Sequence, residues 1–145
     1  MSVEISICEV IDESVVNAFA QLIPQLSSSN PAPDAATLQR IVDHDATTLF
    51  LARLDGRIVG SLTLAVFPIP TGVRAWIEDV VVDEAARGHG VGEALNRAAL
   101  EKARSLGAIT VDLTSRPSRE AANRLYKRLG FVERETNVYR YDLED

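Results

Sequence analysis

The sequence predicts an α/β fold in which a mixed, mostly antiparallel sheet is flanked by helices. Its apolar patterns and turn signals indicate elements in the order β-α-α-β-β-β-α-β-α-β. Three successive strands with short connections predict antiparallel neighbours, because a tight turn joins only antiparallel strands. A later strand follows a long helix, and such a crossover predicts a parallel pair. The chain length suits a single domain that spans residues 1–145.

The first third of the chain predicts one strand and two helices. Residues 3–10 alternate between apolar and polar types, which indicates a half-buried strand. Asp12 can cap a following helix, and Asp34 can cap a second helix that ends near an exposed His44. The segment 27–33 between them is rich in Ser and Pro and therefore predicts a loop. The apolar residues of the first helix share one face: Val15, Val16, Phe19, Leu22, Ile23 and Leu26.

The middle third predicts three antiparallel strands. Residues 47–54 and 57–67 form a hairpin, because the Asp-Gly pair at 55–56 is a strong turn signal. Gly60 lies inside the second of these strands and indicates a bulge or a close approach of another backbone. Residues 74–82 form the third strand, which ends in three consecutive valines.

The last third predicts the crossover and the end of the sheet. Apolar residues at helical spacing indicate a helix over 91–106, which Gly107 ends. The segment 109–114 is the expected parallel strand. Residues 117–129 predict a further helix, and 131–143 predict a final strand at the edge of the sheet. An exposed edge needs cover, so pairing or exchange of this strand with a second chain predicts a homodimer.

A glycine-rich turn between the third strand and the long helix indicates an anion site. Backbone N–H groups at such a turn, together with the helix dipole, favour a phosphate or pyrophosphate. A dinucleotide fingerprint does not fit, because Glu93 stands where its third glycine belongs, and no Gly-Lys-Ser/Thr of a P-loop precedes the helix. A plain strand-to-helix turn is the structural alternative.

Three motifs resemble those of one enzyme family. R-G-H-G-V-G at residues 87–92 resembles the acyl-CoA pyrophosphate loop of the GNAT superfamily of N-acyltransferases. N-R-L-Y-K-R-L-G-F at 123–131 resembles the late Asn-x-x-Tyr…Gly-Phe segment of that family. I-E-D-V-V-V at 77–82 resembles a strand of its amino-sugar-phosphate N-acetyltransferases. The order of the predicted elements is also that of the family, and the resemblance covers roughly residues 49–131.

The resemblance implies an N-acetyltransferase. The acetyl group of acetyl-CoA, a co-substrate, would pass to a primary amine of a small molecule or a protein by direct attack in a ternary complex, without a metal. An amino sugar, a polyamine, an amino acid or a protein amine remain open as acceptors. A non-catalytic module that binds or senses acyl-CoA on the same fold is the alternative function. The implied cofactor contacts, many of them through main-chain groups, are Val80, Val81, Val82, Arg87, Gly88, His89, Gly90, Val91, Gly92 and Asn123.

Two residues are the candidate catalysts. The resemblance places Tyr126 near the sulfur as general acid, and an aromatic at the edge of the core is its structural alternative. Glu78 is the favoured base, directly or through a water, since a carboxylate buried beside Trp76 would suit that work. In a regular strand Glu78 shares a face with Val80 and Val82, while Asp79 lies on the other face with Val81.

Several polar residues keep two interpretations. Asn123 either hydrogen-bonds the cofactor or caps backbone groups, and Arg87 either adds charge to the pyrophosphate site or caps the loop. Arg116 and Arg119 could bind an anionic substrate or the 3′-phosphate of the cofactor, or belong to a solvated face.

The composition limits the partners. A net charge of −6 disfavours nucleic-acid binding and is compatible with a cationic amine. No apolar run reaches the roughly 18–20 residues that span a membrane, and no signal peptide is visible. Cys8 is the only cysteine, so an internal disulfide is impossible, and we expect a buried thiol and a cytoplasmic location.

Overall fold

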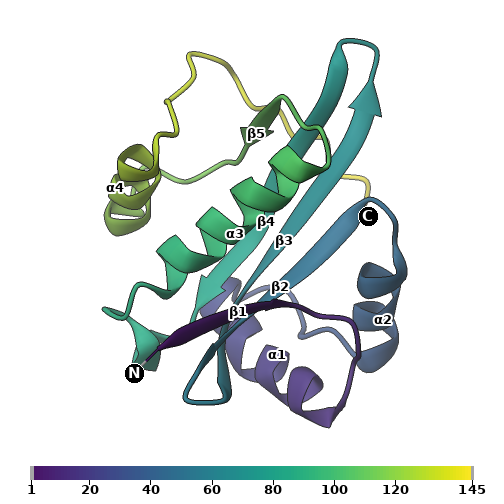
Figure 1. The fold of residues 1–145 in the computed structure, drawn as a ribbon, viewed down its shortest axis with the longest axis vertical. Coiled ribbons are helices and arrows are strands. Elements are labelled where there is room, and N and C mark those ends of the chain that lie inside the picture. The colour runs from purple at the N-terminus through teal and green to yellow at the C-terminus, as the bar shows by residue number, and fades with distance from the viewer. Residues whose placement is uncertain (1, 145) are drawn as a thin grey trace. The chain divides into compact units, whose positions relative to one another are not determined.

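The computed structural model describes residues 2–144. The chain forms two compact units, Met1–Thr114 and Ser115–Asp145. The elements of the first unit, shown in Figure 1, are β1 (Val3–Ile7), α1 (Glu13–Leu26), α2 (Ala35–Asp43), β2 (Thr47–Leu54), β3 (Arg57–Ile69), β4 (Gly72–Val82), the short 3-10 helix η1 (Glu84–Ala86), α3 (Val91–Ser105) and β5 (Thr110–Asp112). The second unit contains α4 (Glu120–Leu129).

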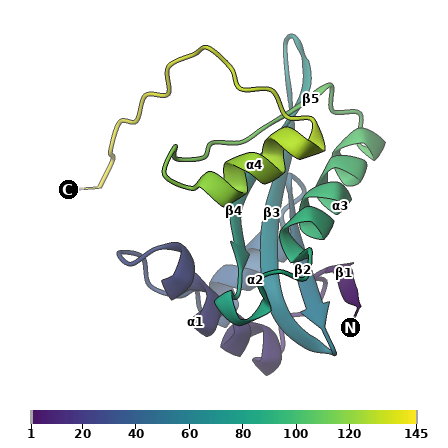
Figure 2. The same ribbon diagram turned by 90° about the vertical axis from the view of Figure 1, so that its left-hand side faces the viewer.

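The sheet of the first unit is mixed and mostly antiparallel, as predicted. Its strand order is β1-β2-β3-β4-β5. The first three pairs are antiparallel, and β4 pairs with β5 in parallel after the crossover through α3. Helices α1 and α2 cover one face of this sheet and α3 covers the other (Figure 2).

The face toward α1 and α2 holds a core cluster. Both helices begin at the predicted caps: a carboxylate oxygen of Asp12 accepts from the Val15 N–H at 3.1 Å, and one of Asp34 accepts from the Thr37 N–H at 2.8 Å. The Ser14 hydroxyl, which also donates to Asp12, and the Val15 N–H lower the pKa of the Asp12 carboxyl, and the Thr37 N–H lowers that of Asp34. Cys8 is buried as predicted, and this burial raises the pKa of its thiol. The buried residues of the cluster are Cys8, Val15, Phe19, Leu38, Leu49 and Leu51.

Gly60 brings α3 close to the opposite face of the sheet. A Cβ atom at this position would lie 3.0 Å from the Val81 carbonyl oxygen and 3.1 Å from the Val91 side chain. Real Cβ atoms rarely approach this closely, so a larger residue would push the helix away. A register shift in the pairing of β2 with β3 occurs beside Gly60. Both predicted reasons for this glycine, a bulge and a close backbone approach, are therefore confirmed.

The predicted final strand is wrong. Residues 131–144 follow α4 without regular secondary structure. A strand is stable only when its backbone groups pair with a neighbouring strand. Among the described residues, none of the five strands pairs with this segment. Beyond Phe131, its large apolar side chains are exposed: Val132, Val138, Tyr139, Tyr141 and Leu143. Among the described residues, no helix has the length and apolar character that crossing a membrane requires.

Candidate functional site

A bulge interrupts β4 at the predicted base. Glu78 pairs with Thr63 of β3, and Val81 pairs with Ser61. Two residues of β4, Asp79 and Val80, therefore lie opposite a single residue of β3, which defines a bulge. Asp79 has a φ of 50°, in the left-handed region that non-glycine residues rarely adopt. Such a conformation costs on the order of 1 kcal/mol, and strained residues of this kind cluster at functional sites.

The bulge changes which side chains share a face. Residues directly opposite in an antiparallel pair point to the same side, so Glu78 and Val81 share the face of Thr63 and Ser61. The expectation that Glu78 shares a face with Val80 and Val82 is therefore wrong. The extra residue in β4 shifts the alternation by one position, which the sequence pattern does not reveal.

This register directs Glu78 toward the α1 and α2 side of the sheet. Leu49 pairs with Thr63, and Leu49 belongs to the cluster that packs against these two helices. The Glu78 side chain is exposed, so the expected burial beside Trp76 is wrong. An exposed carboxylate on this face can meet an amine that arrives from solvent.

One edge of β4 is available beside the bulge. β5 pairs with β4 only from Arg74 to Trp76, so among the described residues only β3 pairs with the rest of β4. The N–H of Asp83 donates to the Val59 carbonyl at 2.7 Å. Because successive N–H groups in an extended strand point to opposite edges, that of Val82 points away from β3. An extended ligand with amide groups can pair with such an edge as a strand would.

The glycine turn follows directly after η1. Gly88 and Gly90 have φ values of 86° and 75°, so both positions require the left-handed conformation that glycine adopts without strain. α3 begins at Val91, and Gly90 before it has no side chain to cap the helix. The turn thus directs backbone N–H groups and the positive end of a 15-residue helix toward one place. His89 fixes the turn through a contact of 3.0 Å between its Nδ1 and the Ala86 carbonyl oxygen.

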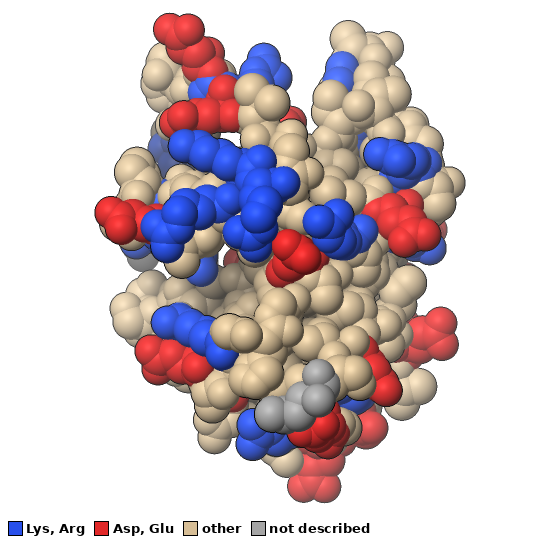
Figure 3. Space-filling model, turned by 60° about the vertical axis from the view of Figure 1, so that its left-hand side comes forward, with Lys and Arg blue, Asp and Glu red and all other residues tan. Residues whose placement is uncertain are grey.

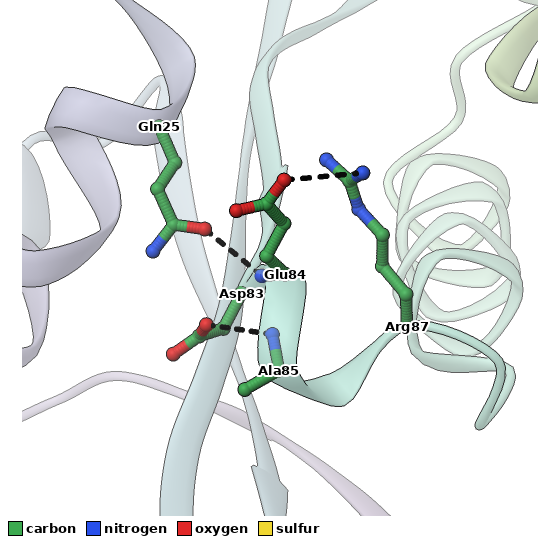
Figure 4. Close-up of polar contacts among 5 residues, drawn as sticks. All are labelled: Gln25, Asp83, Glu84, Ala85 and Arg87. Carbon is green, nitrogen blue, oxygen red and sulfur yellow. Dashed lines mark hydrogen bonds and ion pairs between the residues drawn. The ribbon is translucent and has the colours of Figure 1, made fainter.

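Arg87 lies between η1 and the glycines. Its guanidinium is 3.8 Å from the Glu84 carboxylate, and both side chains are exposed, so this ion pair holds the arginine only weakly (Figure 4). The Glu84 N–H donates to Oε1 of Gln25 on α1 at 2.9 Å, and Oδ1 of Asp83 accepts from the Ala85 N–H. Sequence analysis missed Gln25, because 59 residues separate it from its partner.

Tyr126 lies on α4 in the second unit and is buried. Its ring meets that of Phe131 edge to face, with the ring centres 5.7 Å apart. Gly130, with a φ of 103°, ends the helix and lets the chain fold back, so that the Phe131 N–H donates to the Tyr126 carbonyl at 3.0 Å. The Gly-Phe pair therefore packs against the tyrosine. Burial raises the pKa of the Tyr126 hydroxyl, and the nearby charge of Arg119 opposes this shift in part.

Asn123 organises the segment before α4. Its Nδ2 donates to the carbonyl oxygens of Arg116 and Arg119, each at 2.9 Å, which supports the capping interpretation. The region around α4 is basic despite the negative net charge of the chain, since only Glu120 opposes five cations: Arg116, Arg119, Arg124, Lys127 and Arg128. Several lysine and arginine side chains lie close together in the upper half of the view in Figure 3.

The candidate residues thus form two groups. β4, η1 and the start of α3 bring Glu78, the free strand edge and the glycine turn together within the first unit. Tyr126 and Asn123 lie together on α4 of the second unit. The first group combines an exposed carboxylate, a strand edge that no described strand pairs with, and backbone N–H groups at the start of a helix, where an anion is favoured.

Comparison with known proteins identifies similar sequences. The model of the acetyltransferase (GNAT) family matches residues 15–131. Glucosamine 6-phosphate N-acetyltransferase of Trypanosoma brucei brucei is 37% identical over 92% of this chain and 93% of its own length. Glucosamine 6-phosphate N-acetyltransferase 1 of Oryza sativa subsp. japonica is 32% identical over 88% of this chain and 81% of its own length.

Solved structures show the same likeness. An acetyltransferase of Trypanosoma brucei superimposes with a TM-score of 0.79 at 31% identity and covers 98% of this chain and all of its own. A second solved structure, from Agrobacterium tumefaciens str. C58, has a TM-score of 0.82 at 26% identity and the same coverage of both chains. The predicted fold class is confirmed by these matches.

Proposed function

Because this chain belongs to the GNAT family of acetyltransferases, and therefore transfers an acetyl group from acetyl-CoA to an amine, we propose that its acceptor is an amino-sugar phosphate. The observation that carries this proposal is the likeness, over most of both chains, to two enzymes named for glucosamine 6-phosphate. The strand Ile-Glu-Asp-Val-Val-Val supports the same acceptor class, and the exposed Glu78 lies on this strand.

We assign acetyl-CoA to the edge of β4 and the glycine turn. The pyrophosphate accepts hydrogen bonds from N–H groups between Gly88 and Gly92, and Arg87 turns from Glu84 toward its charge. The pantetheine arm pairs with the edge of β4 through main-chain groups of Val80 and Val82. The Val81 side chain is buried, so this residue holds the strand in place. Asn123 retains its side-chain oxygen as an acceptor for the cofactor.

The chemistry proceeds by direct attack. The amine nitrogen bonds to the thioester carbonyl carbon, and the N–H of Val80 stabilises the oxyanion that forms. Glu78, directly or through a water, takes the proton that the amine loses. The carbon–sulfur bond then breaks, and Tyr126 donates a proton to the departing thiolate. The products are the N-acetylated acceptor and free coenzyme A.

An acceptor panel tests the function. We expect kcat/KM for glucosamine 6-phosphate to exceed that for glucosamine, lysine or spermidine by at least about tenfold, because a phosphate adds charge-assisted contacts. Glu78→Gln removes the base and should lower kcat for the same acceptor by roughly 100-fold. The matched variant Glu101→Gln, at an exposed position of α3 over the opposite face of the sheet, should keep full activity. Equal use of an acceptor without phosphate would contradict the acceptor class, and full activity of Glu78→Gln would contradict the role of the carboxylate.

We also propose a homodimer that covers the C-terminal segment. Tyr139, Tyr141 and Leu143 recur at every second position, which is the spacing of one face of a strand, and each is more than four-fifths exposed. Exposed apolar stripes of this kind mark association surfaces. Pairing or exchange of the segment 131–143 with a second copy would supply both the missing strand neighbour and cover for these side chains.

Light scattering at tens of micromolar protein measures this association. We expect twice the mass of one chain, and we expect the mass of a single chain for the double variant Tyr139→Ser, Tyr141→Ser. A monomeric mass for the unsubstituted protein would refute the dimer. A dimeric mass for both proteins would show that another surface holds the copies together.

A further inference from the structure

A single side chain joins the end of α1 to the turn that carries Arg87. Gln25 lies in the last turn of α1, and its Oε1 accepts from the Glu84 N–H at 2.9 Å (Figure 4). Its Nε2 donates to the Gln21 carbonyl oxygen at 3.1 Å. Because both ends of the amide are bonded, the side chain has a defined orientation between its own helix and the turn.

The turn depends on contacts of this kind for its shape. The N–H of Asp83 donates to Val59, that of Ala85 to the Asp83 carboxylate, and that of Ala86 to the Asp83 carbonyl. Gln25 satisfies the remaining N–H of this series, that of Glu84. Successive N–H groups are thus bonded within the protein up to the point where the glycines begin. The turn is therefore held from β3 and from α1 before it presents Arg87.

Gln25 also lies close in sequence to the loop that follows α1, and α1 covers the face of the sheet where we expect the amine acceptor. The loop 27–34 follows α1 directly and carries several polar side chains, among which Nδ2 of Asn30 donates to the Ser27 hydroxyl at 2.9 Å. α1 packs on the face of the sheet that also presents Glu78. Gln25 consequently links a helix on the face that presents Glu78 to the turn of the proposed pyrophosphate site.

We infer that Gln25 is a positioning residue for acetyl-CoA, which acts through the Glu84 main chain to hold Arg87 and the glycine turn in place. This inference rests on the proposed function, because it needs the pyrophosphate at that turn. Without the Gln25 oxygen, the Glu84 N–H bonds to water instead, and the start of the turn loses its link to α1. Arg87 then samples more orientations, and the cofactor has to fix them when it binds.

Calorimetry with acetyl-CoA tests the inference. Gln25→Ala should raise the Kd roughly three- to tenfold, the effect of one exposed hydrogen bond that orders a site. Gln21→Ala is the matched control, since it removes the same type of side chain one turn earlier in α1. The side chain of Gln21 forms no hydrogen bond with the described residues, and its carbonyl oxygen remains in the variant. In an Arg87→Ala background, Gln25→Ala should raise the Kd by less than about twofold, because coupled residues are not additive.

A merely structural role predicts a different pattern. It would lower the melting temperature of Gln25→Ala and leave the Kd unchanged, or it would give the same fold-change with and without Arg87. Either result would overturn the inference. Failure of the unsubstituted protein to bind acetyl-CoA would instead refute the proposed function, and the inference with it. A KM for the amine acceptor that changes less than about twofold in Gln25→Ala would confirm that the effect belongs to the cofactor side.

Discussion

The variant Tyr126→Phe is expected to bind acetyl-CoA as tightly as the unsubstituted enzyme and to turn over roughly 10- to 1,000-fold more slowly. The substitution removes the hydroxyl and keeps the ring, so the edge-to-face contact with Phe131 remains. The loss falls on kcat because the proton donor acts only when the carbon–sulfur bond breaks. Turnover, cofactor affinity and melting temperature should be measured on the same preparation.

The pH dependence gives this prediction a second readout. Burial raises the pKa of Tyr126, so the hydroxyl stays protonated to a higher pH than a free phenol, whose pKa is about 10. A proton donor is active below its pKa. The rate of the unsubstituted enzyme should therefore fall only as the pH rises through that elevated value, and the Phe variant should lack this basic limb. Because the folded state holds this proton more tightly, the raised pKa also predicts that stability falls in the same alkaline range.

Tyr141→Phe is the matched control, since it removes the hydroxyl of an exposed tyrosine in the C-terminal segment. It should leave turnover and the pH profile unchanged. If Tyr126 serves only to fill the core edge, Tyr126→Phe should lose less than about 1 kcal/mol of stability and keep its turnover. Full activity of Tyr126→Phe would show that water, and not Tyr126, protonates the departing thiolate.

Local signals predicted most of the first unit. Asp12 and Asp34 cap the helices that their positions indicate, and the Asp-Gly pair joins β2 to β3. Gly60 lies at a bulge and at a close backbone approach. Both were predictable because a glycine inside a strand is visible in the sequence. These features depend on a few neighbouring residues, so the sequence is sufficient to find them.

The features that sequence analysis missed depend on partners far along the chain. The bulge at Asp79 follows from the register between β3 and β4, and no glycine marks it. Because of this bulge, Glu78 shares a face with Val81 and not, as predicted, with Val80 and Val82. The final strand was predicted from the local sequence of residues 131–143, but a strand also needs a neighbour, which the described chain does not provide. Gln25 was missed because a hydrogen bond to a distant backbone N–H has no sequence pattern.

The second large effect is expected for Gly90→Glu, which should abolish binding of acetyl-CoA. Gly90 precedes α3 with a φ of 75°, and a Cβ there meets no atom within 4 Å. The new side chain therefore has room in the folded protein. It places a carboxylate at the end of the helix where the pyrophosphate should lie, and the two negative charges repel each other.

Gly56→Glu is the matched control for strain and charge. Gly56 lies in the turn between β2 and β3 with a φ of 80°, and a Cβ there also meets no atom within 4 Å. Both variants force a glutamate into the left-handed region, at a cost of roughly 1–2 kcal/mol, and both add one negative charge. The two melting temperatures should therefore fall by similar amounts, and only Gly90→Glu should lose the cofactor.

Titration of acetyl-CoA into these three folded proteins, followed by calorimetry, tests most directly the claim that the glycine turn binds the cofactor. We predict a Kd of the order of micromolar, about −8 kcal/mol, for the unsubstituted protein. Gly56→Glu should give the same Kd, and Gly90→Glu should give no measurable heat of binding. Unchanged affinity in a folded Gly90→Glu variant would contradict the claim, because the pyrophosphate would then lie elsewhere.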